Sequence, residues 1–402
     1  MHSGEIERDT PGPRVTNRGT FGQDCPVPRR KIFLTLLAGE LVLLAVVALW
    51  KRLDGLDLDV YRLGAQAFFG HGDPYGVLPP TRDGTVLPFT YPPFAAIAFA
   101  PLLSVSLDTA LWALTVISVL ALGAVLALCF SYYDRRAHVA GVAVLAVQAV
   151  ALFSEPVRAT LGFGQINILL MLLVVVDTLG PVKQRGYLIG VAAAVKLTPL
   201  AFVLFFLVRK DFRSAARALG TFVVCGVIAW FFAPDASVKY WTRLVFQGER
   251  IGDPGYIGNQ SLRGLLARLD LGRGWWALAA VLVLALTAWA IHRAKYPVPA
   301  LLACALGALL VSPVSWTHHW VWIGPVIGVL CWQRRWWAAV PATIVFVVSP
   351  LWDYSFWPLR ECYVLAGLVL LALLGKPFHH VLDAVGQRGD VARIDGGEHA
   401  DA

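Results

Sequence analysis

Long apolar stretches recur along the chain from Ile32 to Leu374, and short polar segments separate them. A helix needs about 20 apolar residues to cross the roughly 30 Å of hydrocarbon in a bilayer. Inside the bilayer every backbone N–H and C=O group must find a partner in the protein, and a helix provides these partners within one segment. The pattern therefore predicts an all-α polytopic membrane protein.

The short loops carry most of the positive charge. Lys and Arg gather at residues 29–31, 135–136, 183–185, 209–217, 293–295, 334–335 and 376. Loops of this kind face the cytoplasm. Placing all of them inside predicts full spans at about residues 32–50, 107–131, 139–153, 166–180, 213–233, 274–292, 298–312, 319–332, 336–350 and 362–375. Both termini then lie in the cytoplasm.

The apolar run between Arg185 and Arg209 is too short for two full spans, and Lys196 and Pro199 interrupt its middle. We expect two short helices that meet near the outer side, which brings the number of transmembrane helices to about twelve. Residues 88–103 are then a re-entrant or short helix on the outer side, and a full span is the alternative. Residues 234–273 form a long outer loop.

The composition supports this reading. The chain is 57% hydrophobic and 15% charged, with a mean hydropathy of +0.64, which leaves too little charge for a soluble surface. The net charge of +8 acts as a topology signal in short loops, so no nucleic-acid partner is expected. Residues 1–31 and 381–402 are predicted cytoplasmic tails, and residues 32–380 a single transmembrane domain with an outward-facing active site.

The unusual polar segments all fall on the predicted outer side, although none was used to choose the topology. They read "DLDVYR", "LPFTYPPF", "SEPVRATLGFGQIN", "KLTP", "GNQSLRG" and "SPVSWTHHWVW". Their convergence on one face predicts a single extracytoplasmic site.

Asp57 and Asp59 lie two residues apart after the first span. Their side chains are about 200° apart on a helix and alternate on a strand, so one faces a site and the other faces solvent. One interpretation is a helix N-terminus, where Asp is favoured. The other is a general base that takes a proton from a hydroxyl group.

Lys196 and the pair His318–His319 point to anion or sugar binding. A lysine within an apolar run is costly, so it has either a phosphate ligand or a structural ion-pair partner. Adjacent histidines between tryptophans lack acids or histidines at metal-ligand spacing, so we expect no metal. We interpret them as ligands for phosphate or sugar.

The remaining polar side chains allow two interpretations each. Glu155 and Arg158 are spaced to pair on a helix. Gln165 and Asn167 could satisfy backbone groups at a helix end or bind sugar hydroxyls. Arg263 is either a solvated loop charge or a phosphate ligand.

Taken together, the six segments resemble the polyprenyl-phosphate-sugar-dependent transferases of glycosyltransferase family 87, of the membrane GT-C type. The matching residues include "DLDVY", "LPFTYPPFAA", "EPVRATLGFGQIN", "KLTP", "NQSLRG" and "SPVSWTHHW", in the family's order. The resemblance is greatest to the actinobacterial α-1,2-mannosyltransferases. It implies a GT-C fold of twelve or so helices in the plasma membrane, with the active site on the periplasmic, cell-wall side.

The resemblance also implies roles for individual residues. The first acid of the "DLxVY" pattern is catalytic in the family, which designates Asp57, with Asp59 as the alternative. The residues expected to hold the donor phosphate are Lys196, His318, His319 and Arg263. Those expected to bind sugar or lipid are Tyr61, Tyr91, Glu155, Arg158, Gln165, Asn167, Asn259, Gln260 and Trp316.

The implied reaction is an inverting transfer of mannose from polyprenyl-phosphate mannose to a mannosylated glycolipid or lipoglycan, without a cofactor. The expected partners are the donor, the acceptor and membrane lipids. A polyprenyl-phosphate arabinofuranose donor is the alternative. A transporter would show internal repeats with matched broken helices, whereas the sequence has one such break and no repeat.

Overall fold

The computed structural model describes residues 29–50, 53–133 and 137–376. These residues form α-helices and short 3-10 helices joined by loops, and the strand-like pairing within them is an isolated bridge between Asn259 and Trp316. The predicted all-α class is therefore confirmed for this part of the chain. The tail predicted at 381–402 and residues 1–28 of the other tail lie outside the described residues.

A helix begins or ends close to most of the predicted span boundaries. These helices are α1 (Arg29–Ala48), α4 (Leu107–Ser131), α5 (Ala137–Phe153), α7 (Asn167–Leu179), α8 (Tyr187–Val195), α9 (Val203–Val208), α10 (Phe212–Phe232), α13 (Arg273–Arg293), α14 (Pro297–Val311), α15 (Ile323–Trp332), α16 (Trp336–Val348) and α18 (Cys362–Leu374). Among the described residues, α4, α10 and α13 are long and apolar enough to cross a membrane alone. The number of twelve spans stays a prediction.

Two bends shape the centre of the bundle. The helix α5 meets α6 (Glu155–Gly162) at an angle of 72°, with Pro156 in the first turn of α6. Proline is tolerated in a first turn because no intrahelical bond is lost there. The bend turns α6 toward η5 (Thr317–Trp322), against which it packs.

The predicted break at Lys196 is confirmed. Helix α8 ends at Val195, and Lys196 itself is extended, with φ −143° and ψ 128°. The chain resumes as η2 (Thr198–Phe202), with Pro199 in its first turn. The Asp177 carboxylate of α7 accepts bonds from the backbone N–H groups of Gly186 and Ile189, which caps α8 and fixes it to α7.

The chain between α1 and α4 forms a small subassembly, which is called the outer subassembly because the sequence predicts that it faces outward. It contains α2 (Leu56–Phe69), α3 (Pro93–Ala98) and η1 (Ala100–Ser104), and the last two are too short to cross a bilayer. Tyr61, Phe89 and Phe99 form its core; the rings of Tyr61 and Phe99 stack with centroids 4.3 Å apart. The expectation of a short helix within residues 88–103 is thus met.

The segment predicted as a long loop at 234–273 is partly helical instead. It contains α11 (Pro234–Thr242) and α12 (Leu262–Arg268), besides the short η3 (Leu244–Phe246) and η4 (Gly248–Ile251). Helix α11 starts on Pro234 and buries Tyr240, and Ser261 caps α12 by accepting a bond from the Gly264 N–H group. These local signals form short helices in a segment that the predicted topology assigns to a loop.

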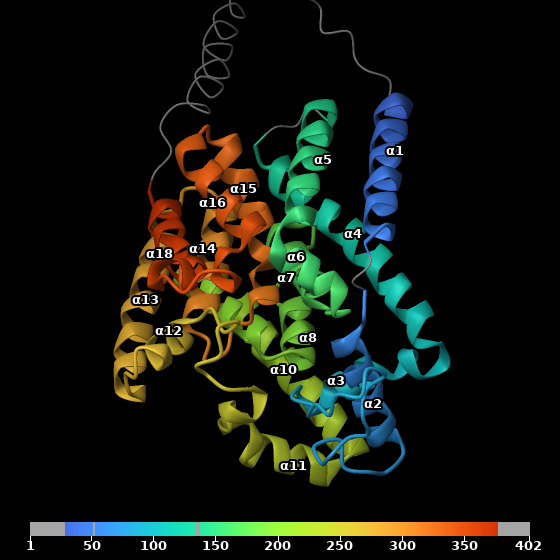
Figure 1. Cartoon of the computed structure of the whole chain (residues 1–402). Coiled ribbons are helices and arrows are strands. Elements are labelled where there is room, and N and C mark those ends of the chain that lie inside the picture. The colour runs from blue at the N-terminus through green and yellow to red at the C-terminus, as the bar shows by residue number, and fades with distance from the viewer. Residues whose placement is uncertain (1–28, 51–52, 134–136, 377–402) are drawn as a thin grey trace, which may run out of the picture.

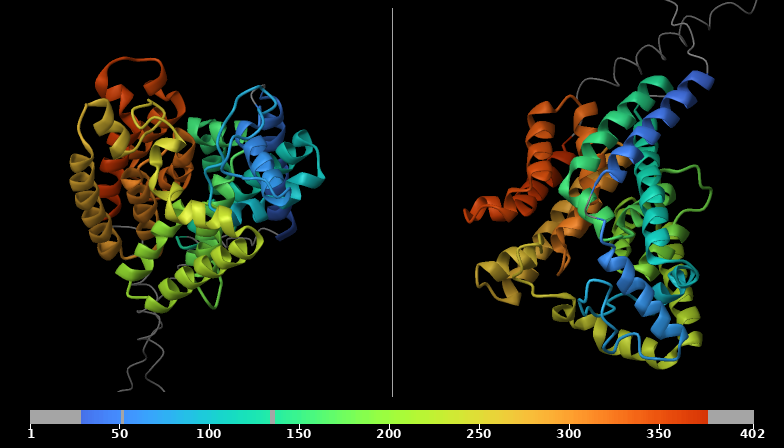
Figure 2. Two further views of the ribbon diagram at one scale, coloured as in Figure 1. Left: turned by 90° about the horizontal axis from the view of Figure 1, so that it is seen from below. Right: turned by 45° about the vertical axis from the view of Figure 1, so that its right-hand side comes forward.

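Figure 1 shows α2, α3 and α11 together at the lower end, opposite the upper end where α1 begins. The view from below in Figure 2 shows the blue α2 and the yellow-green α11 on the near side. The outer subassembly therefore covers one end of the helix bundle. Elsewhere in the bundle, two short elements link α16 to α18: η6 (Pro350–Trp352) and α17 (Trp357–Arg360).

Candidate active site

Asp57 occupies the first turn of α2, and main-chain bonds fix its position. The N–H groups of Asp57 and Leu58 donate to the Phe163 carbonyl at 3.0 and 3.1 Å, and that of Gly55 donates to the Gly162 carbonyl. The start of α2 is thereby attached to the end of α6. Asp54, not Asp57, accepts the bond from the Leu56 N–H group at this helix end.

The two acids of α2 face different partners, as their helical spacing predicts. Asp57 Oδ2 accepts a 2.6 Å bond from the Gln165 side-chain amide in the interior. Asp59 Oδ2 accepts a 2.8 Å bond from the Arg82 N–H group on the outer loop. Asp57 is therefore the carboxylate that faces the interior cluster of polar side chains.

Lys196 lies at the centre of this cluster. Its Nζ atom donates to Asn167 Oδ1 at 2.8 Å and to Gln165 Oε1 at 3.3 Å, and lies 3.2 Å from His319 Nε2. The Tyr91 ring centroid is 5.5 Å away. Every hydrogen-bond partner of this ammonium among the described residues is thus an uncharged group. Asp57 attracts this ammonium by charge but has no hydrogen bond to it among the described residues, so an anionic ligand could contact it directly.

Two tyrosines complete the cluster. Tyr61 donates a 2.6 Å bond to Gln165 Oε1, and its hydroxyl lies 2.9 Å from that of Tyr91. Tyr75 in turn donates to the Tyr91 carbonyl. Because Tyr61 is fully buried in the core of the outer subassembly, the hydroxyl that contacts Gln165 is held firmly.

Side chains of α6 and α7 hold the histidine segment. Thr160 Oγ1 and Asn167 Nδ2 both donate to the His318 carbonyl, at 2.8 and 2.9 Å. Glu155 accepts a 2.8 Å bond from Thr317 and a 3.0 Å bond from Tyr363. The polar atoms of Glu155, Gln165 and Asn167 are therefore engaged with protein groups.

Asn259 and Gln260 join the outer loop to the segment before η5. Both side chains are fully buried. Asn259 donates to the carbonyls of Pro254 and Pro313 and accepts from the Ser315 N–H group, and Gln260 contacts the backbone of Ile257 and Arg360. Trp316, paired with Asn259 in the bridge, packs edge-on against Tyr256 at 5.8 Å. These contacts fix the loop before α12 to the segment before η5.

In the part of the chain that the structure describes, the side chains of Arg158 and Arg263 have no hydrogen bond to the other predicted site residues. Arg158 is exposed on α6, and Arg263 is half-buried near the start of α12. Within the described residues, the hydrogen-bonded cluster consists of Asp57, Tyr61, Tyr91, Gln165, Asn167, Lys196 and His319.

The electrostatics of Asp57 suit a base. Burial raises the pKa of its carboxyl, and the bond from Gln165 and the charge of Lys196 oppose this rise. A carboxylate of raised proton affinity and an ammonium that could hold an anion are separated by one amide. This arrangement could deprotonate a hydroxyl and accommodate an anionic leaving group. No group of three His, Cys, Asp or Glu side chains among the described residues is arranged to hold a metal ion.

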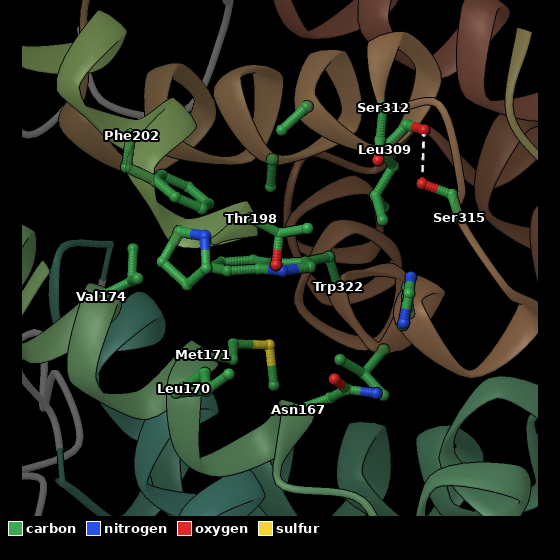
Figure 3. Close-up of a pocket in the computed structure, with 15 residues that line it drawn as sticks. Asn167, Leu170, Met171, Val174, Thr198, Phe202, Leu309, Ser312, Ser315 and Trp322 are labelled. Carbon is green, nitrogen blue, oxygen red and sulfur yellow. Dashed lines mark hydrogen bonds between the residues drawn. The ribbon is translucent and has the colours of Figure 1, made fainter. Parts of the chain in front are cut away.

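A cavity of about 50 Å³ adjoins the cluster. Its polar end is formed by Asn167, His319, Ser312 and Ser315, and its apolar end by Leu170, Met171, Val174, Phe202 and Trp322. Figure 3 shows the aromatic ring of Trp322 and the side chains of Met171 and Phe202 directed into this space. The small side chains of Ala305 and Ala308 on α14 form part of its wall. The cavity thus leads from polar partners of Lys196 to apolar surface.

Several contributors to the site were not singled out from the sequence. Thr160 and Thr317 lie within the quoted segments, so the spacing of polar side chains there was an available signal. Tyr363 lies outside every segment and meets Glu155 only through the fold. The apolar cavity wall has no sequence signature distinct from the rest of the helix bundle.

The comparison with protein families gives a match to the model of glycosyltransferase family 87 over residues 89–313. Among curated proteins, the chain is 40% identical to a polyprenol-phosphate-mannose-dependent alpha-(1-2)-phosphatidylinositol mannoside mannosyltransferase of Mycolicibacterium smegmatis, over 71% of this chain and 73% of that protein. It is 35% identical to a phosphatidylinositol pentamannoside mannosyltransferase of Mycobacterium tuberculosis, over 68% of this chain and 65% of the relative. An alpha-(1->3)-arabinofuranosyltransferase of Corynebacterium glutamicum is 30% identical over 44% of this chain and 42% of that protein. No solved structure matches.

Proposed function

Because the chain belongs to glycosyltransferase family 87, we propose that it transfers mannose from polyprenyl-phosphate mannose to a phosphatidylinositol mannoside through an α-1,2 link. The printed activities of the relatives support this donor and acceptor. The observation that carries the proposal is the placement of Asp57 and Lys196 on opposite sides of the Gln165 amide. This placement supports Asp57 as the base and Lys196 as the residue that binds the phosphate in the proposed transfer reaction.

In the proposed mechanism Asp57 accepts the proton of an acceptor hydroxyl. The hydroxyl oxygen forms a bond to the anomeric carbon of the donor mannose, and the bond from that carbon to the phosphate oxygen breaks. The electron pair of that bond leaves with polyprenyl phosphate, and the proton stays on Asp57. Attack opposite the leaving group inverts a β-linked donor to an α-linked product.

The donor phosphate lies beside Lys196 in this proposal. The ammonium has only uncharged hydrogen-bond partners among the described residues, and His319 is within 3.2 Å of it. A charge fixed at the position where phosphate departs stabilises the transition state. In this proposal His318 and Arg263 also bind the donor phosphate. Tyr91 and Trp316 contact the sugar or the lipid.

The cavity beside Lys196 suits the first isoprenoid units of the donor. Its polar end contains Asn167 and His319, which both contact Lys196, and its other end is lined by apolar side chains such as Met171 and Phe202. A ligand with a phosphate head and a hydrocarbon tail matches this order of surfaces. The tail would leave the site between α7, η2 and α14.

The proposed location is the plasma membrane, with the active site on the periplasmic side. The positively charged short loops, which the sequence predicts to be cytoplasmic, support this orientation. The single domain of residues 32–380 would then present α2, α3 and α11 to the cell-wall side, where a lipid-linked mannose donor and a mannosylated lipid meet.

Purified protein in lipid nanodiscs tests the proposed function. It would be incubated with labelled polyprenyl-phosphate mannose and phosphatidylinositol mannosides, and products would be identified by mass spectrometry and linkage analysis. We expect α-1,2-mannosylated lipid. A product formed only from polyprenyl-phosphate arabinofuranose, or no product at all, would contradict the proposal.

A further inference from the structure

Gln165 connects the two charged groups of the site. Its side-chain nitrogen donates to Asp57 Oδ2 at 2.6 Å, and its side-chain oxygen lies 3.3 Å from Lys196 Nζ. The side chain is buried, with 4% of its surface exposed. One amide therefore contacts the proposed base on one side and the proposed phosphate ligand on the other.

The orientation of this amide follows from its neighbours. The oxygen accepts from the Tyr61 hydroxyl at 2.6 Å as well as from Lys196. A reversed amide would direct N–H groups at an ammonium and a carbonyl oxygen at a carboxylate. Hydrogen-bond partners of this kind determine which way an amide points.

The backbone holds Gln165 in place. Its N–H group donates to the Thr160 carbonyl at 2.8 Å. The preceding Gly164 has φ +67°, and a Cβ atom there would lie 2.7 Å from the Leu58 side chain. The turn between α6 and α7 therefore needs glycine to pack this closely against α2. Gln165 is fixed relative to the helix that carries Asp57.

We propose that Gln165 is a positioning residue that keeps Asp57 and Lys196 apart as two separately usable charges. Its N–H group occupies Asp57 Oδ2, which leaves Oδ1 for the acceptor hydroxyl. Its carbonyl orients the ammonium without neutralising it, which leaves that charge for the donor phosphate. This inference rests on the proposed function and adds a residue that touches neither reacting bond.

Loss of the amide should allow the two charges to meet. Opposite charges at contact distance in a partly buried site attract strongly. A direct Asp57–Lys196 pair would compete with phosphate for the ammonium. The other titratable or charged groups around Asp57 are Asp54 and Asp59 on its own segment, Arg82 on the outer loop, Tyr61, Tyr91 and His319.

Binding of polyprenyl phosphate, measured without turnover, tests this role. Gln165→Met keeps the length of the side chain and removes the amide. We expect this substitution to lower the affinity for polyprenyl phosphate about tenfold when Asp57 is present. In the Asp57→Asn background the same substitution should have little effect, because a neutral amide at position 57 does not pair with Lys196. A purely structural role would weaken binding equally in both backgrounds and would overturn the inference.

Two further variants keep the test decisive. Gln165→Glu preserves the shape of the side chain, and its carboxylate should pair with Lys196 and weaken binding in both backgrounds. Should Gln165→Met fail to fold, unchanged binding in Gln165→Glu would still overturn the inference. Gln148→Met replaces another buried glutamine, bonded to Glu40 and the Val119 carbonyl, and should bind like wild type.

The outcome also separates this inference from the proposed function. A wild type that neither binds polyprenyl phosphate nor transfers mannose would overturn both. An active wild type whose phosphate binding is equally affected by Gln165→Met in the two backgrounds would overturn the role of Gln165 alone.

Discussion

At the scale of residues, two carboxylates two positions apart have different environments. Helical spacing predicts that Asp57 and Asp59 face different directions, but it does not say which faces the interior. The answer depends on Gln165 and Arg82, which reach α2 only through tertiary packing. The free-energy cost of burying a lysine in an apolar run likewise identified Lys196 from the sequence as a candidate. Its uncharged partners are seen only in the folded structure.

The first prediction concerns pH. Burial raises the pKa of Asp57, and the base acts in its ionised form, so kcat/KM should fall as the pH drops through this raised pKa. An ordinary aspartate has a pKa of about 4. The fall in kcat/KM should therefore begin at a pH above that value. A pH profile of kcat/KM for wild type and Asp59→Asn checks this, and both should show the same fall. A profile flat to pH 4 would contradict the assignment.

Lys196→Ala should lower kcat/KM for the donor by about 10- to 100-fold, on the order of 1.4–2.8 kcal/mol, because the phosphate loses its counter-charge. Lys196→Arg should recover part of the activity, since it keeps the charge but not the shape. The exposed Lys239, which pairs with Asp73, supplies the control variant Lys239→Ala. Wild-type binding of polyprenyl phosphate by Lys196→Ala would refute this role.

At the scale of elements, α6 and α7 act together as a frame for η5 and the start of α2. The polar side chains of these two helices and of the turn between them reach Asp57, Thr317, the His318 carbonyl and Lys196. The sequence predicts the break at Lys196, because a lysine and a proline interrupt an apolar run. It does not predict how α6 meets η5, since that contact joins segments about 160 residues apart.

The cavity leads to a prediction on donor length. Ala308→Trp on α14 should fill the apolar part of the cavity and lower kcat/KM for a long-chain donor by about tenfold or more. A donor with one or two isoprenoid units should lose a similar factor, because the first units are proposed to lie in this cavity. Val281→Trp on the exposed face of α13 is the control. An unchanged kcat/KM for both donors would exclude this path for the tail.

At the scale of the whole molecule, the distribution of positive charge along the chain predicts an orientation in the membrane. The positive loops predict which ends of the helices face the cytoplasm, and α2, α3 and α11 gather at one end of the bundle (Figure 1). The sequence therefore predicts the helical class and most helix positions. The helical content of residues 234–273 and the many short helices depend on local capping and bends that apolar periodicity does not report.

Sidedness can be measured with a membrane-impermeant maleimide on intact cells. After Cys25 and Cys331 are replaced by Ser, Val77→Cys, at a position 91% exposed on the loop after α2, should be labelled from outside. Lys183→Cys, on an exposed loop between α7 and α8, should be labelled only after permeabilisation. The reverse pattern would invert the proposed topology.

The central claim is that Asp57 is the base of an inverting mannosyl transfer. The most direct measurement compares wild type, Asp57→Asn and Asp59→Asn with a β-linked polyprenyl-phosphate mannose donor, and determines product yield and anomeric configuration by NMR. The account predicts an α-linked product from wild type and Asp59→Asn, and at least about a 100-fold loss for Asp57→Asn without loss of folding. Near-normal turnover by Asp57→Asn, with loss in Asp59→Asn, would contradict it.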